Sequence, residues 1–205
     1  MDIFLRFFNL SSDVNSSDVV FFQNNASGDS EALSIAWKVI RRCGYGNYHP
    51  FVYSTDCHVS ASDSYGNFTP HLPASPGQLF HAFRGPAGNQ LGLKGRALNS
   101  AEVVLANDLE RGAIGANIFK NDKLFARKTA IAPGQIATFS FKPSLMISAY
   151  SQITEGQGLD SCVMTGRQTE LSLLGVISAD IIMTGGGPDE KAEAFSFHLA
   201  NIVRV

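Results

Sequence analysis

The chain has 205 residues, of which 44% are hydrophobic and only 17% charged, and its formal net charge is −2. This length suits one large β domain over residues 1–205, and the near-neutral charge without a long basic run argues against a nucleic-acid partner. The charged fraction lies below the usual value of about a quarter. Few charges are therefore present to keep neighbouring molecules apart, which favours association with other copies of the chain.

Short runs of alternating hydrophobic residues predict β-strands in the first half of the chain. The first two are expected over 3–9 and 19–23. The run 33–40 predicts a third strand, with a short helix from Ser30 as the alternative. Another strand is expected over 51–61, and three prolines predict an irregular crossing over 69–77.

A short phrase occurs twice, as Ser75-Pro76-Gly77-Gln78 and Ala132-Pro133-Gly134-Gln135. Proline presets φ at the second turn position and glycine supplies the positive φ of the third, which is the chemistry of a type II turn. Each turn is followed by a predicted strand. Two explanations stay open: a duplicated unit that gives two similar halves, or local turn chemistry alone.

The second half continues the same alternation of turns and strands. A glycine-rich loop is expected over 85–95 and a short strand over 102–106. Asn121-Asp122 between 113–120 and 123–130 predicts a hairpin with a type I′ turn. Further strands are expected over 144–153, 170–174 and 176–184, and in the last one Phe195, Phe197 and Leu199 share a face. The whole pattern predicts an all-β protein, an antiparallel β-sandwich of the jelly-roll kind.

The fifteen phenylalanines include adjacent pairs that cannot both point into one core. In a strand, neighbouring side chains face opposite sides of the sheet. Phe7-Phe8 and Phe21-Phe22 therefore predict that some aromatic rings lie outside the sandwich core, either exposed or covered by another element. Exposed and clustered rings would mark an interface.

The compartment and the chemistry are predicted mainly from what the sequence lacks. The start of the chain has no basic signal region and no segment is long enough to span a bilayer, so we expect a cytoplasmic protein without a transmembrane segment. Cys43, Cys57 and Cys162 form no metal or disulfide pattern, which is typical of reduced thiols. No nucleophile elbow or phosphate-binding motif occurs, so we expect neither an enzyme nor a cofactor.

A metal site is the weaker alternative to that expectation. Four histidines fall within one third of the chain, near Cys57 and Asp63, but without zinc-ligand spacing. They are His49, His58, His71 and His81. The segment 63–67 has part of a calcium loop but lacks its glutamate, which favours an Asx turn.

Candidate binding residues are aromatic side chains in turns and a glycine-rich loop, because loops on a rigid scaffold often contact ligands. They are Tyr45, Tyr48, Tyr65, Phe68, Gly185, Gly186 and Gly187. Such aromatic rings could bind a lipid surface or a carbohydrate.

The segment Val19-Val20-Phe21-Phe22-Gln23-Asn24, followed by Leu33-Ser34-Ile35-Ala36-Trp37-Lys38, resembles the start of RhiA-like bacterial proteins, the rhizosphere-expressed family. The resemblance covers about the first quarter of the chain. It implies a small cytoplasmic bacterial protein of unknown biochemical role and brings no catalytic residues.

The sequence thus supports a non-catalytic, self-associating structural or scaffold protein of the bacterial cytoplasm as its first functional hypothesis. The partners expected for it are other copies of itself. A lipid- or carbohydrate-binding β-sandwich module, such as a toxin-like component, is the alternative. A metal-dependent enzyme that uses the histidines is the third.

Overall fold

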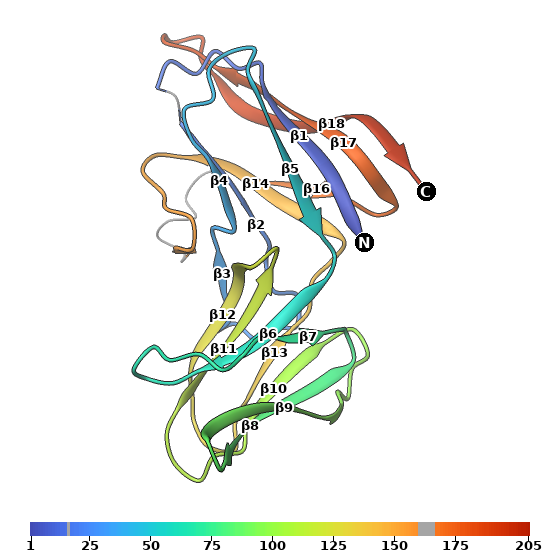
Figure 1. Ribbon diagram of the computed structural model, residues 1–205. Helices are drawn as coiled ribbons and strands as arrows, with labels where there is room; N and C mark the ends of the chain where they lie inside the picture. Colours follow the sequence, from blue (N-terminus) through green and yellow to red (C-terminus); the bar gives the residue numbers. More distant parts are fainter. Residues whose placement is uncertain (16, 160–166) are drawn as a thin grey trace. The chain divides into compact units, whose positions relative to one another are not determined.

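The computed structural model describes residues 1–15, 17–159 and 167–205, and these residues form strands and turns without a helix (Figure 1). The all-β prediction is confirmed. Within this part of the chain no helix is long and apolar enough to cross a membrane.

The chain groups into two compact units rather than successive halves of the sequence. Unit 1 contains Met1–Phe22, Ala36–Thr55 and Pro143–Val205, and unit 2 contains Gln23–Ile35 and Asp56–Lys142. The prediction of a single domain over residues 1–205 stays a prediction, because two such units can still unfold as one cooperative domain.

Unit 1 is built from two four-stranded sheets. The first, sheet A, has the order β18 (Glu193–Arg204), β17 (Val176–Gly186), β1 (Asp2–Asn9) and β5 (Tyr48–Ser54). The second, sheet B, has the order β16 (Thr169–Ser172), β14 (Ser144–Tyr150), β2 (Asp18–Phe22) and β4 (Lys38–Ile40). The unit also contains the short strand β15 (Gly158–Leu159).

Aromatic side chains join the two sheets of unit 1 into a sandwich. The ring of Phe7 in β1 meets Phe21 in β2 edge to face at 6.1 Å, and Phe21 lies 4.9 Å from Phe51 in β5. Trp37 packs edge to face on Tyr53 at 5.4 Å. These contacts place the main core of unit 1 between sheets A and B.

The other face of sheet B is also covered, which answers the question raised by Phe21-Phe22. Both rings are fully buried. Phe22 and Val20 pack with Ala36, Ile153 and Leu159 in a second cluster on the opposite face. The second ring of this pair is therefore covered by the chain itself and is not an interface residue.

Unit 2 is also built from two sheets. Sheet D has the order β13 (Ile136–Phe139), β10 (Val103–Asn107), β8 (Gln78–Gly85) and β9 (Gly88–Arg96). Sheet C includes, in order, β3 (Leu33–Ile35), β12 (Lys123–Ile131), β11 (Ile114–Lys120), β6 (Cys57–Ser62) and β7 (Leu72–Ala74). Phe125 of β12 packs on Phe141, which follows β13, at 5.0 Å, so the two sheets share a core.

The topology supports a β-sandwich but does not establish a jelly roll. Most strand pairs are antiparallel, whereas β1 pairs with β17 and β8 with β10 in parallel. The predicted hairpin is confirmed: β11 and β12 flank Asn121 and Asp122, whose φ angles of 50° and 58° are those of a type I′ turn.

Four predictions of secondary structure were wrong in detail, one of them the irregular crossing over 69–77, which contains strand β7. The run 33–40 forms β3 and β4, neither a helix nor one strand, and 51–61 is divided between β5 and β6. Ala36 donates its N–H to the Gln157 carbonyl and accepts the N–H of Gly156, and Thr55 donates its N–H to the Met1 carbonyl. The strand pairing is therefore interrupted in the middle of both runs. The expected glycine-rich loop over 85–95 is mostly strand β9, paired along its length with β8.

Both Pro-Gly-Gln turns form as predicted. Gly77 and Gly134 have φ angles of 86° and 79°. In each turn the glutamine side chain accepts the N–H of the first residue, at 2.7 Å from Ser75 to Gln78 and 3.0 Å from Ala132 to Gln135. The side chain thus fixes the turn as well as the strand start.

A third turn of the same construction was missed because Glu155 stands in the place of proline. Gly156 has a φ angle of 86°, and Thr154 donates its N–H to the Gln157 side chain at 3.2 Å. Gly156 donates its N–H to the Ala36 carbonyl at 2.8 Å, and the Gln157 carbonyl accepts the Ala36 N–H at 2.9 Å. The second turn makes the same two hydrogen bonds with Asn107. Three copies in two units, two of them in sheet D, favour local turn chemistry over duplicated halves.

Candidate functional site

The predicted binding residues fall into two groups, one in each unit. Tyr45, Tyr48 and the glycines 185–187 belong to unit 1, whereas Tyr65 and Phe68 belong to unit 2. Each group is described within its own unit.

In unit 1 the tyrosine turn and the glycine loop flank the end of β1. Gly46 donates its N–H to the Asn9 carbonyl at 2.7 Å, and Ser12 donates to the Gly185 carbonyl at 2.7 Å. A Cβ on Gly186 would lie 2.9 Å from the Phe195 ring, so this glycine permits close packing inside the β17–β18 hairpin. A role of the glycines 185–187 in ligand contact stays a prediction.

The outer face of sheet A carries an exposed group of apolar side chains, here called the aromatic face. In β1 the odd-numbered residues from Ile3 are buried and the even-numbered ones point outward. Phe4 is 57% exposed, and Phe8 stacks on Tyr48 at 5.3 Å. The strand registers place the following residues on this face: Phe4, Phe8, Tyr48, Pro50, Val52, Ile182 and Val203.

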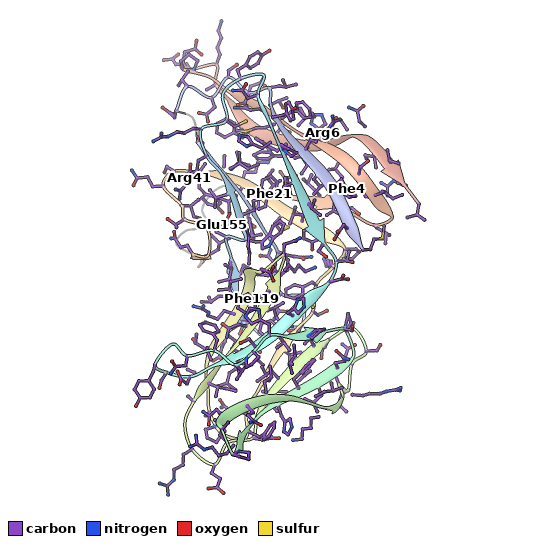
Figure 2. All side chains as sticks on the ribbon, viewed as in Figure 1. Phe4, Arg6, Phe21, Arg41, Phe119 and Glu155 are labelled. Carbon is purple, nitrogen blue, oxygen red and sulfur yellow. The ribbon has the colours of Figure 1, made fainter. Side chains whose placement is uncertain are left out.

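An ion pair lies at the centre of the aromatic face. Arg6 on β1 (Figure 2) donates from Nε and Nη2 to the Asp180 carboxylate at 2.7 and 3.0 Å, and Asn201 donates to the same group at 2.7 Å. Burial acts to raise the pKa of Asp180, but the hydrogen bonds from Arg6 and Asn201 outweigh it and lower that pKa. The charges of Arg6 and Asp180 thus neutralise each other within the sheet.

In unit 2 Tyr65 and Phe68 lie on a loop that Asp63 organises. The Asp63 carboxylate accepts the N–H groups of Tyr65 and Asn67, each at 2.9 Å, and the Asn67 side chain at 2.9 Å. These hydrogen bonds lower the pKa of Asp63, that from the Asn67 side chain most. The predicted Asx turn is confirmed. Tyr65 is 90% exposed at the tip of this loop.

Phe68 lies between two clefts of unit 2. The smaller, of about 220 Å³, is also lined by Arg84 and Asn89, and the larger, of about 510 Å³, by Gly115 and Arg127. Ser62, Asp63, Phe68 and Ile114 line both clefts. The larger volume lies in the range of small-ligand sites, about 300–1,000 Å³.

The four histidines of the predicted metal site are divided between the two units. His49 is in unit 1, and the other three are in unit 2. His71 stacks on Phe119 at 4.0 Å, and His81 contacts the Asp108 carboxylate at 2.8 Å. Among the described residues no group of three His, Cys, Asp or Glu side chains could hold a metal ion. Cys43 and Cys57 are free thiols, and Cys162 lies outside the described residues.

Comparison with known proteins gives no match: no family model, curated protein or solved structure is similar to this chain. The resemblance to RhiA-like proteins therefore stays a prediction.

Sequence reasoning did not find the arginines of these sites. Arg6 could have been noticed as one of the outward residues of an alternating strand, since it follows Asp2 and Phe4 at a spacing of two. Arg84 and Arg127 have no comparable signal in the sequence, because the asparagine that orients each of them lies opposite it on the partner strand of a hairpin.

Proposed function

We propose that this chain is a non-catalytic structural protein that associates with copies of itself through sheet A of unit 1. The observation that carries the proposal is the exposed aromatic face beside an open sheet edge. Monomeric proteins seldom leave a large contiguous apolar surface exposed. The predicted bacterial cytoplasm is retained as the location.

The two edges of sheet A differ in how they are protected. The β5 edge contains Pro50, which lacks an N–H and is typical of strands that should not pair further. The β18 edge runs for 12 residues without a proline, and just before its last residue Ile202 is 39% and Val203 52% exposed. Such an edge is a template for pairing with another strand.

Antiparallel pairing of two β18 strands about a twofold axis would satisfy the open backbone groups of both edges. It would also place the two aromatic faces side by side on one continuous sheet, as a larger apolar surface against which a second pair of copies would pack. The Arg6–Asp180 pair is already formed inside each sheet, so covering this apolar surface would not leave Arg6 unpaired. A stable interface needs about 1,200 Å² or more in total, which the edge and the aromatic face would have to supply together.

Light scattering coupled to size-exclusion chromatography tests the proposal. We expect a dimer or larger species whose fraction rises with protein concentration. Val203→Lys should place a charge on the pairing edge and weaken association by about tenfold or more. Leu98→Lys is the matched control, because Leu98 is also exposed but belongs to unit 2. A wild-type monomer at high concentration would overturn the proposal.

A second candidate function, carbohydrate binding, is favoured by the clefts around Phe68. It concerns unit 2 and does not depend on self-association.

A further inference from the structure

Two arginines of unit 2 are oriented by asparagine side chains. Arg127 donates from Nε to Asn117 Oδ1 at 3.0 Å, and Arg84 donates from Nη1 to Asn89 Oδ1 at 3.1 Å. A neutral amide oxygen fixes a guanidinium group without cancelling its charge. In the described part of the chain neither arginine has a carboxylate partner, in contrast to Lys128, which lies 2.9 Å from Asp29.

The support for Arg127 is built into sheet C. Asn117 is fully buried, and its Nδ2 donates to the Ser60 carbonyl at 3.3 Å and to Ser62 Oγ at 3.1 Å. A buried amide destabilises the fold unless its hydrogen bonds are satisfied. The amide oxygen of Asn117, Oδ1, is satisfied by the hydrogen bond that it accepts from Arg127. Gly115 leaves the space for this network, since a Cβ there would lie 2.5 Å from Ser62 Oγ.

An aromatic ring stands between the two arginines. Phe68 is 47% exposed and lines both clefts, with Arg84 in the smaller and Arg127 in the larger. Its ring meets Phe119 edge to face at 6.4 Å, and this contact fixes its orientation. An exposed ring beside oriented polar groups is suited to stacking against the apolar face of a sugar.

Taken together, the ionisable groups that line the two clefts carry one net positive charge. Asp63 also lines both, but its oxygens accept three N–H groups of its own loop. The other ionisable lining groups are the two guanidinium groups. These retain free N–H donors in the fork geometry that binds carboxylates in pairs.

We propose that the clefts around Phe68 bind an acidic carbohydrate, with uronate carboxylates on Arg127 and Arg84 and a sugar ring against Phe68. A larger cleft of about 510 Å³ beside a smaller one suits adjacent residues of an oligosaccharide. A nucleic acid is less favoured, since the net charge of −2 and two isolated arginines do not form the basic stripe that polyphosphates need. One aromatic ring also offers too little apolar area to hold a membrane surface.

Isothermal titration calorimetry with hexagalacturonate and with neutral cellohexaose tests this inference. We expect binding of the acidic oligomer only. Arg127→Met should weaken it by about tenfold or more, because a charge-assisted hydrogen bond is lost. Phe68→Ala and Arg84→Gln should also weaken it, and both change exposed side chains that can be altered without unfolding.

The controls separate a binding role from a structural one. Arg111→Gln removes an exposed arginine of the same unit outside the clefts and should leave the affinity unchanged. Thermal melting of each variant checks that it is folded. The inference is overturned if hexagalacturonate fails to bind, if cellohexaose binds equally well, if oligothymidylate binds more tightly, or if folded Arg84→Gln and Phe68→Ala proteins keep wild-type affinity. None of these results depends on the oligomeric state.

Discussion

Lys120 provides a test of the interior of unit 2, because it is a lysine buried at the end of β11. Its side chain is 6% exposed, and Nζ lies 5.0 Å from the centre of the Phe125 ring. Burial lowers its pKa from 10.5 to about 8, while the negative charges of Cys57 and Asp56 act in the opposite direction. As the pH rises, the folded protein therefore releases this proton at a lower pH than the unfolded chain does.

The perturbation is Lys120→Met, which replaces the ammonium group by an apolar end of similar length. Between pH 8 and 10.5 the unfolded chain holds a proton that the folded wild type has lost, so the wild-type free energy of unfolding rises with pH. At about 1.4 kcal/mol for each pKa unit, the rise is about 3 kcal/mol. The variant lacks this rise. Below pH 8 it avoids the cost of burying a charge, and it should be the more stable protein there.

Urea unfolding followed by far-ultraviolet circular dichroism at pH 7.5, 9 and 10.5 measures the effect. Burial also raises the pKa of Cys57, which lowers stability at high pH, and Lys120 acts to lower that pKa, so its removal changes the difference in the same direction. The quantity to compare is therefore the stability of the wild type minus that of the variant, which should increase with pH. A difference that stays constant within about 0.5 kcal/mol over this range would refute the reasoning.

Three other predictions concern the turns, the core and the ion pair. Gly134→Ala should lower the free energy of unfolding by about 1–2 kcal/mol, because alanine is strained at a positive φ. Gly77→Ala should lower it more, because a Cβ there would also lie 3.3 Å from the Ser100 carbonyl. The reverse order in chemical denaturation would contradict this prediction. Phe21→Ala should cost about 3–5 kcal/mol in the same assay, and a loss below about 1 kcal/mol would mean that the ring is not in the core. Asp180→Asn should be less stable than wild type at pH 7, and the difference should shrink as the pH falls through the lowered pKa of Asp180; a pH-independent difference would show that the charge is irrelevant.

Local turn chemistry explains why much of the fold could be predicted. A type I′ hairpin at Asn121-Asp122 and a type II turn at Pro-Gly depend on two or three adjacent residues. The missed breaks depend instead on distant partners. Ala36 pairs with Gly156 and Gln157, and Thr55 pairs with Met1, while the hydrophobic alternation continues across both positions. Periodicity reports which side of a strand is buried but not which strand lies beside it.

The position of Arg127 also depends on strand pairing that the sequence does not reveal. Continuing the register of the tight turn, with Lys120 opposite Lys123, would place Ala126 opposite Asn117. An irregularity between Ile118 and Phe119 shifts the pairing by one residue, so that Arg127 lies opposite Asn117. A bulge of this kind re-aims side chains and is common beside functional sites. The exposed aromatic residue Phe68 was predictable from its turn, but its charged neighbour required the bulge.

The two sites differ in how their arginines are compensated, and this difference indicates which partner each can accept. On the aromatic face Arg6 is neutralised by Asp180, which leaves an apolar surface that loses little when another protein surface covers it. In the clefts Arg127 is held by the uncharged Asn117, so the guanidinium group keeps a charge that an anionic ligand can satisfy. Replacing Asn117 by Asp would place a carboxylate against Arg127 and should abolish binding of hexagalacturonate even if the variant stays folded. Self-association through the β18 edge, which belongs to unit 1, should be unaffected, which makes this variant a test that separates the two functions.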